Sequence, residues 1–361
     1  MGVTLETVKW LGLSLTESCN LSCKYCSVDA KSGGLFLDFH KVKSFFDFFS
    51  PFSDASLRIV ISGGEPLLHP KLLEIIKYAE DLFLSPQIVL VTNGVAPAGV
   101  FEELLKKTKI MFQITFEGLP EIHDTERVTP NGEPTSHDVL KTLKQILAYD
   151  PERLMVRVNY SPKKFGRETE IAAFFESLGV KKVAPGIMAA IGRGKDYPHI
   201  DVANSMKKWP GFVKILQNRD MAVRVAIQAS SEWPPCGAGK HSFFLTVDGK
   251  LSVCQSILNT RNMPSCLSPF IVGDVNDEVR LNREKLEAFL KFSSEFPENC
   301  RKCDFKTFCS GCPLEKARSG GSFPATFCSN MQSQICGLIR QDLLDNAKLK
   351  KACGLSIYND E

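Results

Sequence analysis

The hydrophobic and polar positions follow two different spacings over the first 200 residues of the chain. Short apolar runs that end in turn residues are typical of buried strands, and longer segments with apolar residues three or four positions apart are typical of amphipathic helices. We expect six strands, at residues 8–16, 56–64, 87–94, 110–118, 154–161 and 182–189. The clearest helices are expected at residues 37–50, 70–83 and 136–150, where they would cover the outside of the sheet.

Strands that alternate with helices predict an α/β fold with a parallel sheet. Six such units predict a partial (β/α)6 barrel, TIM-like but not fully closed. After about residue 200 this alternation of strands and helices is lost, and the last third is rich in loops and cysteines. The charged segment 282–299 indicates a solvated helix, and residues 334–354 indicate a closing helix. We expect a barrel domain at residues 1–230, a cysteine-rich domain at 231–345 and a C-terminal tail at 346–361.

Composition and charge narrow the class of protein. Hydrophobic residues make up 43% and charged residues 24% of the chain, as in ordinary soluble globular proteins. No apolar run reaches the ~18 residues that span a bilayer, and the N-terminus lacks the pattern of a secretory signal, so we expect a cytoplasmic protein without membrane contact. The net charge of +3 comes from interspersed signs without a basic stripe, so nucleic-acid binding is not expected.

The thirteen cysteines fall into two groups. Cys19, Cys23 and Cys26 come first, and the other ten lie between Cys236 and Cys353. Disulfides do not persist in a reducing compartment, so close C-x-x-C spacings there indicate metal binding. The long gap between the groups predicts two separate metal-binding regions.

The first cysteine group follows the first expected strand, and other polar motifs follow the next strands. In a parallel α/β fold, ligands bind at the carboxyl ends of the strands, so the cysteine loop, the GGEP segment 63–66, residues 92–94 and residues 117–118 should meet on one rim. Three thiolates can hold three irons of a cubane iron–sulfur cluster, which leaves the fourth iron open to an amine and a carboxylate. The alternative is a zinc site completed by a distant histidine, but the six histidines show no ligand spacing.

The glycines of GGEP would let the backbone approach a ligand, and Glu65 can accept a hydrogen bond from an ammonium group. The spacing C-x-x-x-C-x-x-C followed by GGEP resembles the radical S-adenosylmethionine (SAM) superfamily. In that family the open iron binds SAM, and one-electron reduction yields a 5′-deoxyadenosyl radical that abstracts hydrogen from the substrate.

The resemblance implies roles for particular residues of the barrel. Cys19, Cys23 and Cys26 would hold a 4Fe-4S cluster. The cofactor would be bound by Tyr25, close to the adenine, and by Gly63, Gly64 and Glu65, with weaker ribose or carboxylate contacts from Thr115 and Asn159. Either of the last two could equally be a buried polar residue bonded to backbone. The segment 121–127 (EIHDTER) resembles one common in the same group, so His123 and Arg127 face substrate or cofactor or else belong to a surface loop.

The cysteines of the last third resemble the SPASM extension, which carries two auxiliary 4Fe-4S clusters and would bring the total to three. The motif C-x12-G-x4-C fits at residues 236–254, whereas the last spacing, CSGC, is one residue shorter than usual. The resemblance assigns the distal cluster to Cys300, Cys303, Cys309 and Cys328, and the nearer one to Cys236, Cys254 and Cys312. Cys266 is either the missing fourth ligand of the nearer cluster or a free buried thiol, and Cys336 and Cys353 are expected in the core. Two structural zinc sites are the alternative.

The resemblance further implies a peptide or protein substrate that is oxidised or crosslinked after translation, as in the maturation of ribosomal peptides. The auxiliary clusters would accept an electron or bind substrate, and a flavodoxin- or ferredoxin-like protein would donate electrons. Because the cluster motif begins at residue 19, we expect no leader-binding domain before the barrel, and hence a separate peptide-recognition protein or a leader-independent substrate. The alternative is an oxidoreductase or decarboxylase of a small molecule. A non-catalytic electron carrier has no need of a three-ligand cluster beside GGEP.

Overall fold

The computed structural model describes residues 5–225, 234–261, 263–309 and 311–354. Its centre is a curved sheet of parallel strands that follow one another in sequence order. They are β1 (Val8–Ser14), β2 (Ser53–Ser62), β3 (Gln87–Thr92), β4 (Met111–Thr115), β5 (Leu154–Tyr160) and β6 (Lys182–Ile187). All six predicted strands are confirmed.

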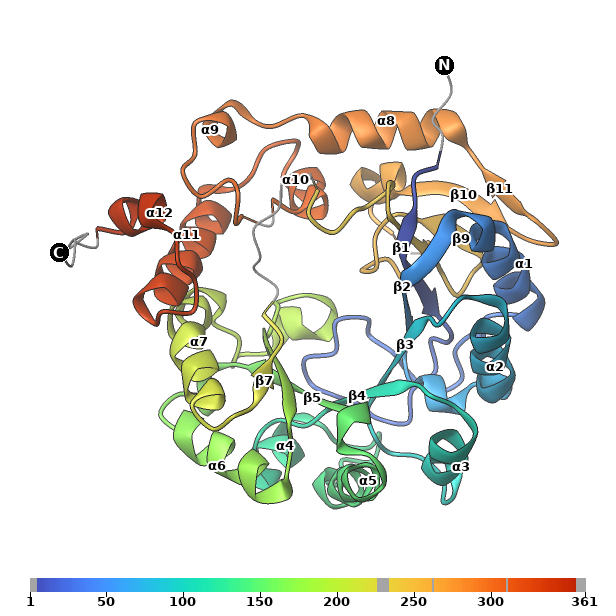
Figure 1. Cartoon of the computed structure of the whole chain (residues 1–361), viewed down its shortest axis with the longest axis horizontal. Helices are drawn as coiled ribbons and strands as arrows, with labels where there is room; N and C mark the ends of the chain where they lie inside the picture. Colours follow the sequence, from blue (N-terminus) through green and yellow to red (C-terminus); the bar gives the residue numbers. More distant parts are fainter. Residues whose placement is uncertain (1–4, 226–233, 262, 310, 355–361) are drawn as a thin grey trace.

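Helices cover the outside of this sheet (Figure 1). They are α1 (Phe39–Phe49), α2 (Leu72–Leu82), α3 (Val100–Lys107), α5 (Ser136–Tyr149) and α6 (Glu168–Leu178), with the short α4 (Pro120–Glu126) following β4. The expected loss of the alternation after residue 200 is wrong, because α7 (Val202–Gln217) and β7 (Ala222–Val223) add one more helix and strand. This unit is hard to predict from the sequence, because α7 contains Pro210 and β7 has only two residues.

The strands separate an apolar layer from a polar one. On β2, Leu57, Ile59 and Ile61 are fully buried in the core that includes the outer helices, whereas Arg58 and Ser62 point into the barrel. Successive side chains of a strand face opposite sides, so this alternation follows from the sequence. The main hydrophobic core therefore lies between the sheet and the helices, whereas the interior of the barrel is lined in part by polar side chains.

The sheet continues past β1 into the last third of the chain. β8 (Ser242–Leu245) pairs parallel with β1, and β9 (Lys250–Ser252), β10 (Ile271–Val275) and β11 (Val279–Leu281) follow in antiparallel order. The described strands thus form one sheet of eleven, in the order β11-β10-β9-β8-β1-β2-β3-β4-β5-β6-β7. The predicted α/β fold with a partial barrel and a cysteine-rich C-terminal part is confirmed, and the two parts share this sheet.

Helices of the last third lie along the side of the barrel between β7 and β1, in orange to red in Figure 1. They are α8 (Arg283–Ser294), α9 (Glu298–Arg301), α10 (Pro313–Arg318), α11 (Ala325–Arg340) and α12 (Ala347–Ala352). The expected solvated helix is α8, but it buries Leu286 and Phe289 completely. The expected closing helix is instead two helices, α11 and α12, joined by a disulfide between Cys336 and Cys353. Cys336 is buried in the core as predicted, whereas the disulfide was not expected.

No helix in the described ranges combines the length and the hydrophobicity needed to cross a lipid bilayer.

Candidate active site

The loop that follows β1 brings its three cysteines together. Cys19 and Cys23 are buried in a small cluster with Leu21 and Ala30, and Cys26 packs against the same cluster. Burial raises the pKa of the Cys19 thiol to about 11, and the neighbouring Cys23 and Cys26 add to this. The grouping agrees with three ligands of one cluster, and the ligand role itself stays a prediction.

The kind of metal centre can be tested against this donor set. In a cubane cluster each thiolate binds a different iron, so the ligands surround a volume and not a point. Within the part of the chain that the structure describes, no three His, Cys, Asp or Glu side chains are arranged to hold one metal ion. Three neighbouring thiols in one loop match the three ligands that such a cluster needs.

The GGEP segment lies directly against the backbone that leads into the cysteine loop. The Gly64 amide donates to the Thr16 carbonyl over 2.7 Å, and the Glu65 amide donates to the Ser18 carbonyl over 2.8 Å. A Cβ on Gly64 would lie 2.3 Å from the Ser18 oxygen, and Gly63 has a φ of +140°. Only glycine fits there, so both glycines allow a close approach of the chain to its own cysteine loop. The predicted approach to a cofactor stays a prediction.

Glu65 is completely buried where β2 ends. Its carboxylate accepts hydrogen bonds from the Leu67 amide (3.0 Å), the Thr92 hydroxyl (2.7 Å) and the Asn93 amide (2.7 Å). Burial raises the pKa of Glu65 to about 7, although these donors act in the opposite direction. A carboxylate has about four acceptor sites, so one remains for a further donor. Asn93 also donates to the Asn20 side chain (2.8 Å), which ties β3 to the cysteine loop.

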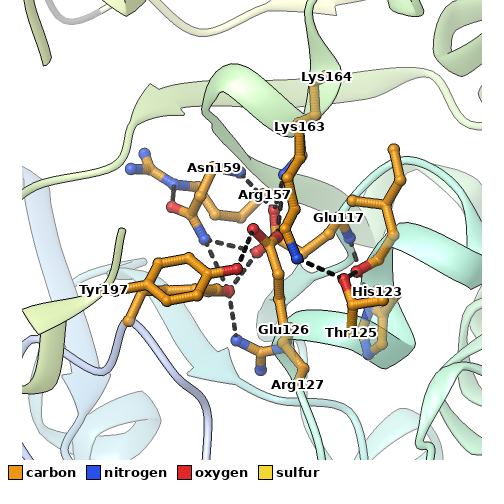
Figure 2. A network of polar contacts seen from close by, with 12 residues as sticks. Glu117, His123, Thr125, Glu126, Arg127, Arg157, Asn159, Lys163, Lys164 and Tyr197 are labelled. Atoms are coloured by element: carbon orange, nitrogen blue, oxygen red, sulfur yellow. Dashed lines mark hydrogen bonds and ion pairs between the residues drawn. The ribbon is translucent and has the colours of Figure 1, made fainter. Parts of the chain in front are cut away.

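A second buried polar network joins the ends of β4 and β5 (Figure 2). Glu117 is fully buried and accepts hydrogen bonds from the Tyr25 hydroxyl and from the Asn159 side chain (2.8 Å) and amide (3.1 Å). Arg127 donates to the Tyr25 oxygen over 2.9 Å. The structure therefore brings Tyr25 and Asn159, two predicted cofactor contacts, to one place. Thr115 is half-buried at the end of β4, outside this network.

Lys164 is the second centre of the network, and sequence reasoning missed it. Its Nζ lies 3.1 Å from a carboxylate oxygen of Glu117 and 3.1 Å from one of Glu126, and all three residues are fully buried. Burial alone would raise the pKa of Glu117, but Lys164 and Arg127 hold it below its usual range. Burial and the Glu117 charge raise the pKa of Glu126, which also accepts from the Tyr197 hydroxyl (3.2 Å). Perturbed carboxyl groups of this kind are typical of functional sites.

The EIHDTER segment forms α4 and the residue that follows it, so the surface-loop alternative is wrong. His123 is completely buried, its ring stacks on Phe116, and its Nδ1 accepts from the Glu117 amide over 3.3 Å. Burial, with a contribution from Arg127, lowers the pKa of His123 to about 3, so the ring is neutral at neutral pH. His123 thus supports the loop that carries Glu117, whereas Arg127 contacts Tyr25 directly.

A cavity of about 710 Å³ occupies the inside of the barrel. Ser27, next to Cys26, lies in its wall, and so does Gln255, next to Cys254. The residues that line the cavity come from the barrel strands, from α7 and α11, and from β8. The N-terminal cysteine loop and the C-terminal cysteine region therefore adjoin the same cavity.

The cysteines expected at the nearer auxiliary cluster are neighbours. Burial raises the pKa of Cys254 to about 12, and the thiols of Cys312 and Cys236 add to this. Cys254 and Cys312 also pack against the main core. Cys266 is exposed on the short 3-10 helix Ser265–Phe270, so it is not the buried thiol that one alternative foresaw.

The cysteines expected at the distal cluster form a second set. Burial raises the pKa of Cys309 to about 11, with further contributions from Cys303, Cys300 and Cys328. The two sets thus have the memberships that the resemblance implies, and their metal content stays a prediction.

A partial barrel with a three-cysteine loop on its rim and a cysteine-rich C-terminal part defines an iron–sulfur enzyme of the SAM-binding kind. Residues 13–158 match the family model described as "Radical SAM superfamily". This match identifies residues 13–158 as a radical SAM domain, and the fold of the C-terminal third agrees with the predicted SPASM domain.

Two curated relatives span most of the chain. The antilisterial bacteriocin subtilosin biosynthesis protein AlbA of Bacillus subtilis (strain 168) is 25% identical over 87% of this chain and 69% of its own. The AdoMet-dependent heme synthase of Methanosarcina barkeri (strain Fusaro / DSM 804) is 24% identical over 86% of this chain and 92% of its own. Among solved structures, native anSMEcpe with bound AdoMet and Kp18Cys peptide superposes with a TM-score of 0.72, covering 96% of this chain and 99% of its own at 16% identity. That last similarity is one of fold.

Proposed function

We propose that this radical SAM enzyme abstracts hydrogen from a peptide or protein substrate, and that the product is an oxidised or crosslinked side chain. The observation that carries the proposal is the shared cavity, because residues adjacent to Cys26 and to Cys254 both line it. A substrate held there lies beside the predicted SAM-binding cluster and beside the nearer auxiliary set.

The residues of this chain would divide the work in the following way. Cys19, Cys23 and Cys26 hold the first cluster, and Glu65 offers its free acceptor site to the SAM amine. SAM, when bound, supplies the 5′-deoxyadenosyl radical that abstracts hydrogen. Tyr25 and Asn159 contact the cofactor, and both are held in place by the buried Glu117.

The C-terminal cysteines would form the electron path. The set of Cys236, Cys254 and Cys312 lies beside the cavity and is suited to accept an electron from the substrate or to bind it. The set that includes Cys309 is a second group of neighbouring thiols, which would take the electron on from the nearer set. A flavodoxin- or ferredoxin-like protein would supply the electron for the first cluster.

The relationship to a bacteriocin biosynthesis protein supports the peptide substrate. A small-molecule substrate is the second candidate, since one relative is an AdoMet-dependent heme synthase. The cavity of about 710 Å³ also lies within the range of roughly 300 to 1,000 Å³ that is usual for small-ligand sites.

The test uses anaerobically reconstituted enzyme with SAM, a reductant and peptides encoded beside its gene. We expect 5′-deoxyadenosine together with a peptide product that has lost hydrogen, both measured by mass spectrometry. The Cys19→Ala variant is the control and should form neither. Formation of 5′-deoxyadenosine with unmodified peptides would favour the small-molecule candidate, and its complete absence would contradict both.

A further inference from the structure

We propose that the barrel cavity is an anion-binding site and that the part of the substrate held there carries two or more carboxylates. The inference rests on the proposed function, because it names the chemistry of the substrate for the same cavity. It is carried by three arginines in the cavity wall and by two buried donor atoms there that have no partner within the described ranges.

The cavity wall is rich in hydrogen-bond donors and, among the described residues, contains no acidic side chain. Arg58 on β2, Arg157 on β5 and Arg224, just after β7, all line it. The other polar lining residues are Ser14, Ser27, Ser62, Gln113, Gln255 and Gln334. Such a wall has a net positive charge, which favours an anionic occupant.

Arg58 is the clearest sign that a partner is missing. Its Nε is buried and has no hydrogen-bond partner among the residues that the structure describes, and the same holds for Nε1 of Trp10 on the adjoining strand β1. A buried donor left unsatisfied costs stability, so such groups in native proteins usually have a ligand or a structural reason. Burial lowers the pKa of Arg58 to about 10, and the Arg224 charge adds to this, but the group stays charged at neutral pH.

Arg157 links the cavity to the predicted cofactor site. Its Nε donates to the Asn159 side chain over 3.1 Å, and Asn159 in turn contacts Tyr25. Its guanidinium lies over Gly186 of β6, where a Cβ would come within 1.8 Å of Nη2. The absence of a side chain at Gly186 therefore gives the guanidinium the space that it occupies.

Three like charges around one cavity repel each other unless an anion lies between them. Burial lowers the pKa of Arg157; the charges of Glu117 and Tyr25 act in the opposite direction, and the Arg224 charge lowers it further, as expected for guanidinium groups that share a space. The planar guanidinium matches a carboxylate in bidentate geometry. SAM brings a single carboxylate, which the open iron would take, so three arginines call for further anionic groups. An unmodified peptide carries its negative charge on carboxylates, which makes carboxylate the expected group.

The test measures binding by calorimetry on the anaerobic holoenzyme with SAM present. One probe is tricarballylate, compared with its neutral triamide. The other is an acetylated, amidated peptide rich in Asp and Glu, compared with its Asn and Gln counterpart. We expect at least one anionic probe to bind and both neutral ones to fail. Arg58→Gln should weaken that binding by about tenfold or more, as expected for a lost charged hydrogen bond, and Arg58→Lys should recover most of it.

Two further variants make the result specific. Arg224→Gln should also weaken binding. Since the two arginines lie on different elements, a local folding defect at Arg58 would not explain a loss in both variants. Arg219→Gln removes the same charge from a surface ion pair with Glu176, outside the cavity, and should leave binding unchanged. Binding that is equal for neutral and anionic probes, or that is insensitive to Arg58 and Arg224, overturns the inference.

The two arms also identify the source of the carboxylates. Binding of the acidic peptide alone supports a peptide substrate, whereas binding of tricarballylate alone supports an anion site for a small polycarboxylate. Formation of 5′-deoxyadenosine by the wild-type enzyme tests the proposed function independently. If SAM is cleaved but no anion binds, only this inference is contradicted. If an anion binds but SAM is not cleaved, only the proposed chemistry is contradicted.

Discussion

Glu65 and Glu117 are both fully buried carboxyl groups on the rim of the barrel, yet their surroundings push their pKa values apart. Glu65 is bonded only to neutral donors, and burial raises its pKa to about 7. Glu117 would also be raised by burial, but Lys164 and Arg127 hold its pKa below its usual range. The surroundings therefore decide the charge of each group: Glu117 is ionised at neutral pH, whereas Glu65 is partly protonated and partly ionised there.

The free acceptor site of Glu65 predicts a specific effect on cofactor binding. Glu65→Gln keeps the shape of the side chain but weakens it as an acceptor. We expect SAM affinity to fall by roughly 1.5 to 3 kcal/mol, the value of a hydrogen bond to a charged group, without loss of the first cluster. Titration of SAM against the spectroscopic signal of the cluster measures the SAM affinity and shows whether the first cluster is present. Glu17→Gln, at a carboxylate that pairs with Arg261, is the matched control, and an unchanged affinity in Glu65→Gln would reduce GGEP to a structural turn.

The raised pKa of Glu65 also predicts a dependence of stability on pH. The folded protein holds the proton up to about pH 7, whereas the unfolded chain releases it near its ordinary 4.5. The folded state binds more protons in that window, so the contribution is complete below pH 4.5 and is lost as pH rises through 7, at about 1.4 kcal/mol per pH unit. Between pH 5.5 and 7 the Tm of SAM-free wild type should fall more steeply than that of Glu65→Gln. Parallel Tm profiles for the two proteins would contradict this.

Lys164 is expected to matter through the charges that it neutralises. Lys164→Met removes the one Nζ that pairs with both Glu117 and Glu126, and removal of one member of a buried ion pair typically costs about 3 to 5 kcal/mol. Its neighbour Lys163 is half-buried and bonded to Thr125, so Lys163→Met should cost less than about 1 kcal/mol. Thermal unfolding of both variants compares them directly. Equal stabilities would show that the two carboxyl groups are protonated in the folded state.

At the scale of elements, the sequence predicts those parts whose periodicity is long enough to see. Six strands and helices α1, α2 and α5 carry clear apolar patterns, and all were found. Strands β8, β9 and β11 have only three or four residues, and they exist because β1 and β10 offer them edges to pair with. The link between Lys164 and Glu117 escaped prediction for the same reason, since only the finished barrel brings the ends of β4 and β5 together.

The contact between α7 and α11 provides a prediction at this scale. A Cβ on Gly337 of α11 would lie 2.6 Å from the Pro210 ring of α7, so Gly337→Ala should push the helices apart and cost about 1 to 3 kcal/mol. Gly211 of α7 is also helical but has open space around its missing Cβ, so Gly211→Ala should stabilise by about 0.5 to 1 kcal/mol. The unfolding temperature measured by calorimetry should therefore fall in Gly337→Ala and rise in Gly211→Ala, although both variants add one methyl group. A stabilising Gly337→Ala would mean that the two helices are not in close contact.

At the scale of the whole molecule, β8 decides how the two cysteine regions meet. It extends the barrel sheet next to β1, and the chain then passes through Cys254 at the end of β9. The loop after β1 carries Cys19, Cys23 and Cys26 towards the same cavity. Cysteine spacing alone predicted two regions and their membership, but a cavity between them depends on strand pairing that no local pattern encodes.

The division of the C-terminal cysteines leads to the last prediction, for which Cys254 and Cys266 form a matched pair. Cys254 is partly buried against the core and has Cys236 and Cys312 as neighbours, whereas Cys266 is exposed twelve residues further along the chain. Cys254→Ala should remove or alter one auxiliary cluster, seen as lost iron and a changed electron paramagnetic resonance spectrum, while SAM binding at the first cluster persists. Cys266→Ala should leave iron content and spectrum unchanged, because Cys266, unlike the equally exposed Cys236, is not among the thiols that act on Cys254. The nearer cluster would then have three cysteine ligands and an iron open to substrate. Loss of a cluster in Cys266→Ala would instead require the helix Ser265–Phe270 to turn its thiol inward when metal binds.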